Sequence, residues 1–329
     1  MNYENVDIII PVHNSEKFLL ECLNSVESQN YNNIHLIIIN DGSTDSSQNI
    51  IDSFKRSSHL EITVLFNKSA RGVSKARNQG LDIANGPYVT FLDSDDVLLK
   101  DHINDLVQTI KVTKSKLAIT GAIKQTKINH INSTLKLQSV PSTKAMKAIL
   151  GFGNIQGYSV NKLYKLEKIN RVGLKFDNSL FICEDLYFVC SYIKEITGEI
   201  GFTGTNTYIY RENEDSNLAQ RKKLADIIKK GKNEQRAYAA ILQIMDTEQE
   251  KKYCELKKTW AMINFIKRVV LIANPYHCIP EVMDIYSGQK KHFLIRAVLS
   301  GFFPLKDLVH LIIDIHTIQI KLGKLNKTL

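Results

Sequence analysis

Residues 6–14 of this 329-residue chain read VDIIIPVHN, a largely β-branched apolar run that ends in the polar pair His13-Asn14. A run of this kind predicts a strand that is covered on both faces of a parallel sheet, because such strands are apolar at nearly every position. Comparable runs follow at residues 34–39, 62–66 and 88–92. The first hundred residues therefore contain four predicted strands.

Predicted helices separate these strands. Residues 15–29 carry apolar side chains at helical spacing, a second helix is expected to end near Phe54, and a third is expected over residues 73–84. Strands and helices that alternate with short connections predict a doubly wound α/β layer with right-handed crossovers. Short strands are also expected at residues 117–123 and 205–210, with helices from about residue 218 onward.

Polar clusters follow three of the four predicted strands. They are residues 11–14 after the first strand, residues 41–45 after the second and residues 93–96 after the fourth. Ligands of doubly wound sheets bind beyond the carboxyl ends of the strands. We therefore expect these three clusters to meet in one site.

The third cluster, Asp93-Ser94-Asp95-Asp96, holds three carboxylates in four positions. Like charges packed this closely repel one another unless a cation joins them, and hard oxygen ligands suit Mg²⁺ or Mn²⁺. The alternative is a helix N-terminus, in which acidic side chains ahead of Val97-Leu98-Leu99 would stabilise the helix dipole. The spacing alone leaves both interpretations open.

The other clusters are equally ambiguous when each is taken alone. Residues 41–45, Asp-Gly-Ser-Thr-Asp, fit a turn with a helix cap, and His13-Asn14 fits a structural role. Arg71 and Arg77 flank a predicted helix start, where guanidinium groups and the helix N-terminus would favour phosphate. The alternative for these arginines is a solvated helix face.

Taken in order, residues 11–14, 41–45, 72–80 and 91–96 resemble the corresponding motifs of the family 2 glycosyltransferases. The resemblance covers residues 5–105 closely and continues more loosely through later short motifs, namely Asn161-Lys162-Leu163-Tyr164, Cys183-Glu184-Asp185 and Tyr208-Ile209-Tyr210-Arg211. It implies the GT-A nucleotide-diphospho-sugar transferase fold, an α/β fold with a doubly wound mixed sheet, here followed by a helical C-terminal extension.

The resemblance also implies residue roles on the donor side. The residues that would contact the nucleotide sugar are Pro11, Val12, His13, Asn14, Asp41, Arg71, Arg77, Asp93 and Ser94. Asp41 would accept a hydrogen bond from the base, and Asp95, with help from Asp93, would bind Mn²⁺ or Mg²⁺. His13 departs from the family pattern, in which tyrosine is commoner, although an imidazole can still stack on a base.

On the acceptor side, the resemblance makes Asp185 the catalytic base and pairs it with Glu184. Lys162, Arg211 and Asp96 would contact phosphate or acceptor. Asp185 would take the proton of the acceptor hydroxyl during a single displacement with inversion, while cationic groups stabilise the departing diphosphate. An acidic pair at a helix N-terminus is the alternative for Glu184-Asp185.

Composition restricts the remaining possibilities. Five scattered cysteines without a C-x-x-C pair argue against a disulfide framework and a zinc site, and favour a reducing compartment. The N-terminus lacks a signal-peptide pattern, and no stretch of eighteen apolar residues occurs. We expect a donor-binding half at residues 1–105, an acceptor-binding half with the catalytic base at 106–217 and a basic helical extension at 218–329.

The net charge of +9 lies in the last third of the chain, where residues 216–329 carry 20 Lys/Arg against 10 Asp/Glu. Residues 305–322 predict an amphipathic helix. Three interpretations stay open for this extension: packing on the catalytic domain, peripheral contact with an anionic membrane that would suit a lipid-linked acceptor, and homo-oligomer formation.

The sequence thus predicts an inverting glycosyltransferase, with a UDP-sugar as the expected donor and a glycan or lipid-linked saccharide as acceptor. We expect it to act in the cytoplasm or on the inner face of the plasma membrane, in synthesis of a bacterial capsule, exopolysaccharide or lipopolysaccharide. A sugar nucleotidyltransferase is the alternative enzyme, disfavoured because residues 11–17 lack a glycine-rich loop. A nucleic-acid-binding module is disfavoured because the basic residues of the last third are dispersed among acids and aliphatics.

Overall fold

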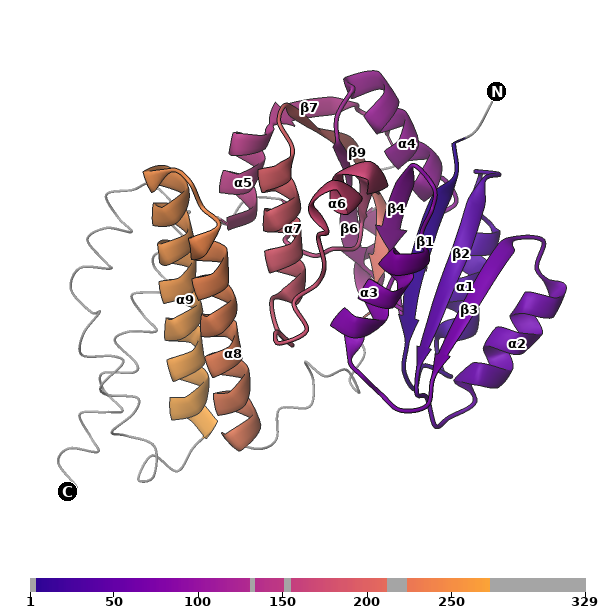
Figure 1. Ribbon diagram of the computed structural model, residues 1–329, viewed down its shortest axis with the longest axis horizontal. Helices are drawn as coiled ribbons and strands as arrows, with labels where there is room; N and C mark the ends of the chain where they lie inside the picture. The colour runs from indigo at the N-terminus through magenta and orange to yellow at the C-terminus, as the bar shows by residue number, and fades with distance from the viewer. Residues whose placement is uncertain (1–3, 131–133, 151–154, 212–223, 273–329) are drawn as a thin grey trace. The chain divides into compact units, whose positions relative to one another are not determined.

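The computed structural model describes residues 4–130, 134–150, 155–211 and 224–272 (Figure 1). These residues fall into two compact units. The first contains the described residues up to 145 and those of 157–211, and the second contains 146–150, 155–156 and 224–272. All residues predicted for the site, from Pro11 to Arg211, belong to the first unit.

The first unit is built on a mixed sheet whose strands follow the order β3-β2-β1-β4-β8-β6-β9-β5. The first four pair in parallel, and they confirm the four strands predicted from the sequence. Every residue of β1 and β2 is buried, as expected for strands covered on both faces. The elements of this half are β1 (Val6–Val12), α1 (Leu19–Glu27), β2 (Ile34–Asp41), α2 (Ser47–Ser57), β3 (Glu61–Asn67), α3 (Val73–Ile83) and β4 (Tyr88–Phe91).

Right-handed crossovers set α1 and α2 on one face of these strands and α3 on the other. Helix α3 lies close to β1 at Gly80, where an added Cβ would stand 2.5 Å from Cγ2 of Ile9. Glycine at this position therefore sets the distance between helix and sheet. That distance decides how deeply the side chains on α3, among them Arg77, reach toward the carboxyl ends of the strands.

The second half of the sheet was only partly predicted. Strand β8 is antiparallel to β4 and β6, β6 and β9 are parallel, and β5 and β7 are antiparallel to β9. The predicted strands near 117–123 and 205–210 are present, and the latter begins earlier. The elements are β5 (Val97–Leu98), α4 (His102–Thr113), β6 (Leu117–Lys124), η1 (Gln125–His130), β7 (Gln138–Pro141), α5 (Ser142–Leu150), β8 (Lys162–Lys165), α6 (Leu166–Val172), α7 (Glu184–Glu195) and β9 (Glu199–Tyr210).

One alternative from the sequence is wrong. Val97–Leu98 forms strand β5, paired with β9, and the next helix begins only at His102. The carboxylates of residues 93–96 therefore do not stand in the first turn of a helix. Their clustering needs another explanation.

The second unit contains the helices α8 (Leu224–Gln243) and α9 (Glu248–Ile272), which pack against each other. Within it, the ring of Phe265 lies so close to Gly231 that a Cβ there would be 2.2 Å from Cδ2. None of the helices in the described ranges is both long and apolar enough to cross a membrane. The amphipathic helix predicted at residues 305–322 lies outside the described residues.

We expect Gly80→Ala to lower the free energy of unfolding by about 1 kcal/mol or more. Alanine normally stabilises a helix relative to glycine by about 1 kcal/mol, but overpacking a core costs about 1–3 kcal/mol. The stiff, β-branched Ile9 cannot move its Cγ2 away by rotation without leaving its preferred rotamer. Urea unfolding of the variant measures the change.

The matched control is the same substitution in an Ile9→Ala background. Removing the Cγ atoms of Ile9 should make Gly80→Ala neutral or stabilising there, which gives a coupling energy between the two sites of about 1 kcal/mol or more. Additive effects of the two substitutions would show that this contact does not set the position of α3.

Candidate functional site

The site lies where β1, β2 and β4 end. Pro11 and Val12 are buried, so they can offer a ligand only backbone atoms, whereas His13 and Asn14 are exposed. Asn14 has a positive φ of 50°, a conformation that asparagine tolerates better than most residues. The turn at Asn14 redirects the chain from β1 toward α1.

Hydrogen bonds join the loop after β1 to the loop after β2. The Nδ1 atom of His13 lies 2.8 Å from the carbonyl oxygen of Asp41, and the side chain of Asn14 accepts a bond from the Thr44 amide at 2.8 Å. Three further bonds of this kind link the Ser15 amide to Ser47 Oγ, the Glu16 amide to Asp45 Oδ2, and the Ser46 amide to Glu16 Oε2. The two loops therefore form one rigid ligand-facing edge.

The side chain of Asp41 organises the segment that leads into α3. It is 3% exposed, and it accepts hydrogen bonds from the amide of Gly72 at 2.7 Å, from the amide of Arg71 and from the Asn67 side chain. A carboxylate offers about four lone-pair sites, so little capacity is left for a nucleobase. The predicted bond from Asp41 to a base stays a prediction.

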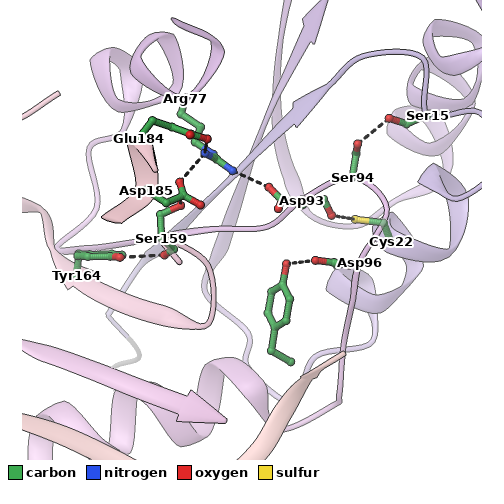
Figure 2. Close-up of polar contacts among 11 residues, drawn as sticks. Ser15, Cys22, Arg77, Asp93, Ser94, Asp96, Ser159, Tyr164, Glu184 and Asp185 are labelled. Carbon is green, nitrogen blue, oxygen red and sulfur yellow. Dashed lines mark hydrogen bonds and ion pairs between the residues drawn. The ribbon is translucent and has the colours of Figure 1, made fainter. Parts of the chain in front are cut away.

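The loop after β4 is tied to the loop after β1. The hydroxyl groups of Ser94 and Ser15 are 2.6 Å apart, and the Cys22 thiol donates to the carbonyl oxygen of Asp93 at 3.5 Å (Figure 2). Ser94 is buried, so its hydroxyl serves this link. All three polar clusters predicted from the sequence thus meet at one edge of the sheet.

Arg77 connects this edge with the start of α7. Its guanidinium donates to Asp93 Oδ1 from Nη2 at 2.8 Å and to Asp185 Oδ1 from Nη1 at 2.7 Å, and Nη1 lies 3.5 Å from Glu184 Oε1. Figure 2 shows Arg77 between Asp93 on one side and the Glu184–Asp185 pair on the other. Arg77 is 3% exposed, so a solvated helix face is wrong for this arginine.

The surroundings of Arg77 keep it charged and fixed. Burial by itself would lower the pKa of the guanidinium, but the carboxylates of Asp185, Asp93 and Glu184 outweigh burial and raise the pKa. One face of the group lies over the Phe176 ring, with Cζ 5.3 Å from the ring centroid, a cation–π arrangement. By contrast, the side chain of Arg71 is exposed and could reach an anionic ligand.

Asp185 and Glu184 form the first turn of α7, which confirms a helix start there without excluding a second role. The Oδ1 atom of Asp185 also accepts a hydrogen bond from the Ser159 hydroxyl at 2.8 Å, and Tyr164 donates to the carbonyl oxygen of Ser159. Ser159 was not predicted, because it lies 26 residues from its partner and only the fold brings the two together.

Glu184 has a perturbed pKa. Burial, followed by the negative charge of Asp185, raises the pKa of Glu184 to about 7, although Arg77 opposes the shift. One guanidinium thus faces three carboxylates, and at neutral pH Glu184 is partly protonated. A proton on Glu184 relieves some of the excess negative charge.

Asp96 and Arg211 are bonded to other parts of the protein. Asp96 is buried and accepts from the Tyr208 hydroxyl at 2.5 Å and from the Arg211 amide at 2.8 Å. The Arg211 guanidinium donates to Glu21 at 2.6 Å and lies over the Phe18 ring. Asp96 therefore fixes the end of β9 to the loop after β4, and Arg211 fixes it against α1. Contact of either side chain with a ligand stays a prediction.

Lys162 is fully buried. Its ammonium donates to the carbonyl oxygen of Tyr158 at 2.7 Å and to Asn161 Oδ1 at 3.0 Å. Burial lowers the pKa of Lys162 to about 7, although the Asp185 carboxylate acts in the opposite direction. In this arrangement the ammonium supports the backbone next to Ser159, and a direct contact with phosphate or acceptor stays a prediction.

The carboxylates of residues 93–96 fit a divalent cation that needs few protein ligands. Both oxygens of Asp96 accept hydrogen bonds, whereas Asp93, with a side chain 36% exposed, and the half-buried Asp95 are the more accessible carboxylates. No group of three potential metal-binding side chains occurs among the described residues. Mg²⁺ and Mn²⁺ suit this set, because such ions bind through one or two carboxylates together with substrate phosphates.

The chain was compared with known proteins. Residues 7–173 match the family model described as Glycosyl transferase family 2. Glycosyltransferase GlyG of Streptococcus pneumoniae serotype 4 is 34% identical over 116 residues, which are 35% of this chain and 38% of GlyG. The chain thus covers well under two thirds of this relative.

Solved structures share the fold. The crystal structure of S. aureus TarS 1–349 in complex with UDP-GlcNAc matches with a TM-score of 0.63 at 17% identity. The match covers 91% of this chain and 93% of the TarS chain. The mannosyltransferase PcManGT from Pyrobaculum calidifontis, in complex with GDP-Man and Mn²⁺, has a TM-score of 0.59 at 14% identity, with coverages of 98% and 87%. The predicted GT-A fold is confirmed.

We expect Arg77→Met to lower the free energy of unfolding by about 3 kcal/mol, because it leaves three half-buried carboxylates close together without their cation. Arg71→Met, six residues earlier with an exposed side chain, should change it by less than about 0.5 kcal/mol. Urea unfolding of both variants at pH 7 gives the comparison. Equal effects of the two substitutions would contradict the structural role of Arg77.

The titration of Glu184 predicts a pH dependence of stability. Its pKa rises from 4.5 in the unfolded chain to about 7 in the fold. Between these values the folded protein holds a proton that the unfolded chain has released, so the free energy of unfolding should fall as pH rises, by at most about 1 kcal/mol per pH unit. Glu184→Gln should remove this component from urea unfolding measured at pH 5, 6, 7 and 8. An unchanged slope would assign the pH dependence to other groups.

Proposed function

Because the chain belongs to glycosyl transferase family 2, we propose that it transfers a sugar from a nucleoside-diphosphate donor to an acceptor hydroxyl. The observation that carries this proposal is the link made by Arg77, which joins Asp93 on the donor side to Asp185 on the acceptor side through one guanidinium. In a displacement the attacking and the attacked atom must lie in line, about 3–3.5 Å apart. A rigid link between the donor side and the acceptor side supports such an arrangement.

On the donor side, the edge formed by the loops after β1 and β2 would hold the nucleotide, with His13 and Arg71 exposed toward it. A UDP-sugar is the proposed donor, because the TarS structure that shares this fold contains UDP-GlcNAc. Asp95 and Asp93 would hold Mn²⁺ or Mg²⁺, which when bound supplies positive charge against the departing diphosphate.

On the acceptor side, Asp185 would act as the general base. Among the described residues it accepts two hydrogen bonds, from Arg77 and Ser159, and both end on Oδ1, which leaves the lone pairs of Oδ2 for the acceptor hydroxyl. The two bonds fix the direction in which Oδ2 faces. The acceptor oxygen would lose its proton to Oδ2 while it attacks the anomeric carbon from the face opposite the diphosphate, with inversion.

The proposed acceptor is a growing bacterial surface glycan, free or lipid-linked. The name of one relative, poly(ribitol-phosphate) beta-N-acetylglucosaminyltransferase TarS of Staphylococcus aureus, supports a polymeric acceptor. Capsule, exopolysaccharide and lipopolysaccharide are the candidates. The excess positive charge of residues 216–329 supports the proposal that this last third contacts a membrane peripherally. The proposal of homo-oligomer formation concerns the same segment. Retention on anionic liposomes, compared with retention on heparin, would separate membrane contact from binding of nucleic acid.

We expect Asp185→Asn to abolish transfer while donor binding is kept. The amide cannot take a proton from the acceptor, so the rate should fall by about 10²–10⁴-fold. Asp95→Asn should instead weaken the metal-dependent part of donor binding. A panel of nucleotide sugars with Mn²⁺, read as release of the free diphosphate, measures transfer, and calorimetry with UDP, with and without Mn²⁺, measures binding.

Asp177→Asn is the matched control, because this carboxylate bonds only its neighbour Ser179 among the contacts described. It should keep both activity and UDP binding. Near-normal transfer by Asp185→Asn would contradict the assignment of Asp185 as the general base. A wild-type protein that binds no nucleotide with or without Mn²⁺ would contradict the proposed function altogether.

A further inference from the structure

Two tyrosines expose their rings beside the carboxylates of the site. Tyr158 is 52% exposed and Tyr210 is 38% exposed, whereas every other tyrosine in the described part of the chain is buried or half-buried. An exposed aromatic ring lacks the stabilisation that aromatic side chains usually gain from burial. Two exposed rings at one site therefore indicate a surface that binds a ligand. Neither tyrosine was singled out from the sequence for a binding role.

The backbone of Tyr158 is held beside the proposed base. Its carbonyl oxygen accepts the bond from the buried Lys162 ammonium, and the next residue, Ser159, bonds to Asp185. Partial burial, followed by the negative charge of Asp185, raises the pKa of the Tyr158 hydroxyl. The backbone that carries the exposed Tyr158 ring is thus anchored next to the serine that bonds to Asp185.

Tyr210 belongs to the same sheet face as Tyr208. Side chains two residues apart on a strand point to the same side, and the Tyr208 hydroxyl bonds to Asp96. The amide of Arg211, the next residue, bonds to Asp96 as well. The end of β9 that carries Tyr210 is therefore fixed beside the carboxylates that follow β4. Burial, followed by the negative charge of Asp96, raises the pKa of the Tyr210 hydroxyl.

We propose that Tyr158 and Tyr210 form the acceptor subsite, a pair of aromatic surfaces that stack against the pyranose ring whose hydroxyl group meets Asp185. A pyranose has an apolar face of C–H groups and a rim of hydroxyls. Aromatic rings bury the face, and the tyrosine hydroxyls can bond to the rim. This inference rests on the proposed function and names the substrate class of the same site.

The position of Tyr158 indicates that the tyrosine pair binds the acceptor and not the donor. The groups proposed to bind the nucleotide lie at the ends of β1 and β2. Tyr158, in contrast, directly precedes Ser159, which orients the proposed general base Asp185. An acceptor hydroxyl that reaches Oδ2 of Asp185 carries its ring over the adjoining surface. That surface contains the exposed rings.

The test uses Tyr158→Ala and Tyr210→Ala, with Tyr158→Phe and Tyr210→Phe as variants that keep the ring. Val112→Ala, at a 65% exposed position on α4, is the control for loss of an exposed apolar side chain. The probes are methyl β-glycosides of glucose, galactose, mannose and N-acetylglucosamine, added to the full chain with UDP and Mn²⁺. Saturation-transfer NMR measures glycoside binding, and calorimetry measures UDP binding.

We expect at least one glycoside to bind the wild-type protein, with saturation at its axial ring protons. Each alanine variant should weaken that binding about tenfold, the factor that corresponds to about 1.4 kcal/mol. The phenylalanine variants and Val112→Ala should stay within about threefold, and all variants should bind UDP as the wild type does.

Three results would overturn the subsite. They are alanine variants that keep glycoside binding, alanine variants that lose UDP binding to the same extent, and a wild type that binds UDP but none of the glycosides. In each of these cases the donor site stands. Failure of the wild-type protein to bind UDP would instead remove the proposed function, so the two failures are distinguishable.

Discussion

One buried guanidinium holds the site together. Arg77 reaches the carboxylates of Asp93, Glu184 and Asp185, which come from segments about a hundred residues apart. A buried charge is tolerated only when it is paired and hydrogen-bonded, so the position of each of these groups depends on the others. The sheet edge that would hold a donor and the helix that would supply a base therefore form one unit, and Ser159 adds a second fixed bond to that base.

The rest of the structure prepares this ion cluster. Gly80 allows α3 to lie against β1, which brings Arg77 to the sheet edge, and Phe176 covers one face of the guanidinium. Phe176 itself stacks on Phe188 of α7 with 4.1 Å between ring centroids. An aromatic core thus supports both the arginine and the helix that carries two of its partners.

Prediction from the sequence succeeded where the signal was local. The parallel strands were recognisable because a buried strand shows itself in its own residues, such as 6–12 and 34–39. It did not recognise the strand at Val97–Leu98, where a helix start was one of two open interpretations, because a strand of two residues is stabilised by its pairing with β9 and not by its own composition. The order of the motifs supplied the family resemblance, and the resemblance implied the fold.

The sequence by itself determined the α/β layer, the edge at which polar side chains gather, and the carboxylates available there. Only the tertiary structure decided the use of each side chain. It placed Arg77, a predicted nucleotide contact, at the centre of a carboxylate cluster, gave Asp41 and Asp96 internal partners, and set Ser159 beside Asp185. The physical reason is that a hydrogen bond or ion pair depends on distance in space, and partners separated by 26 to 115 residues leave no trace in local pattern.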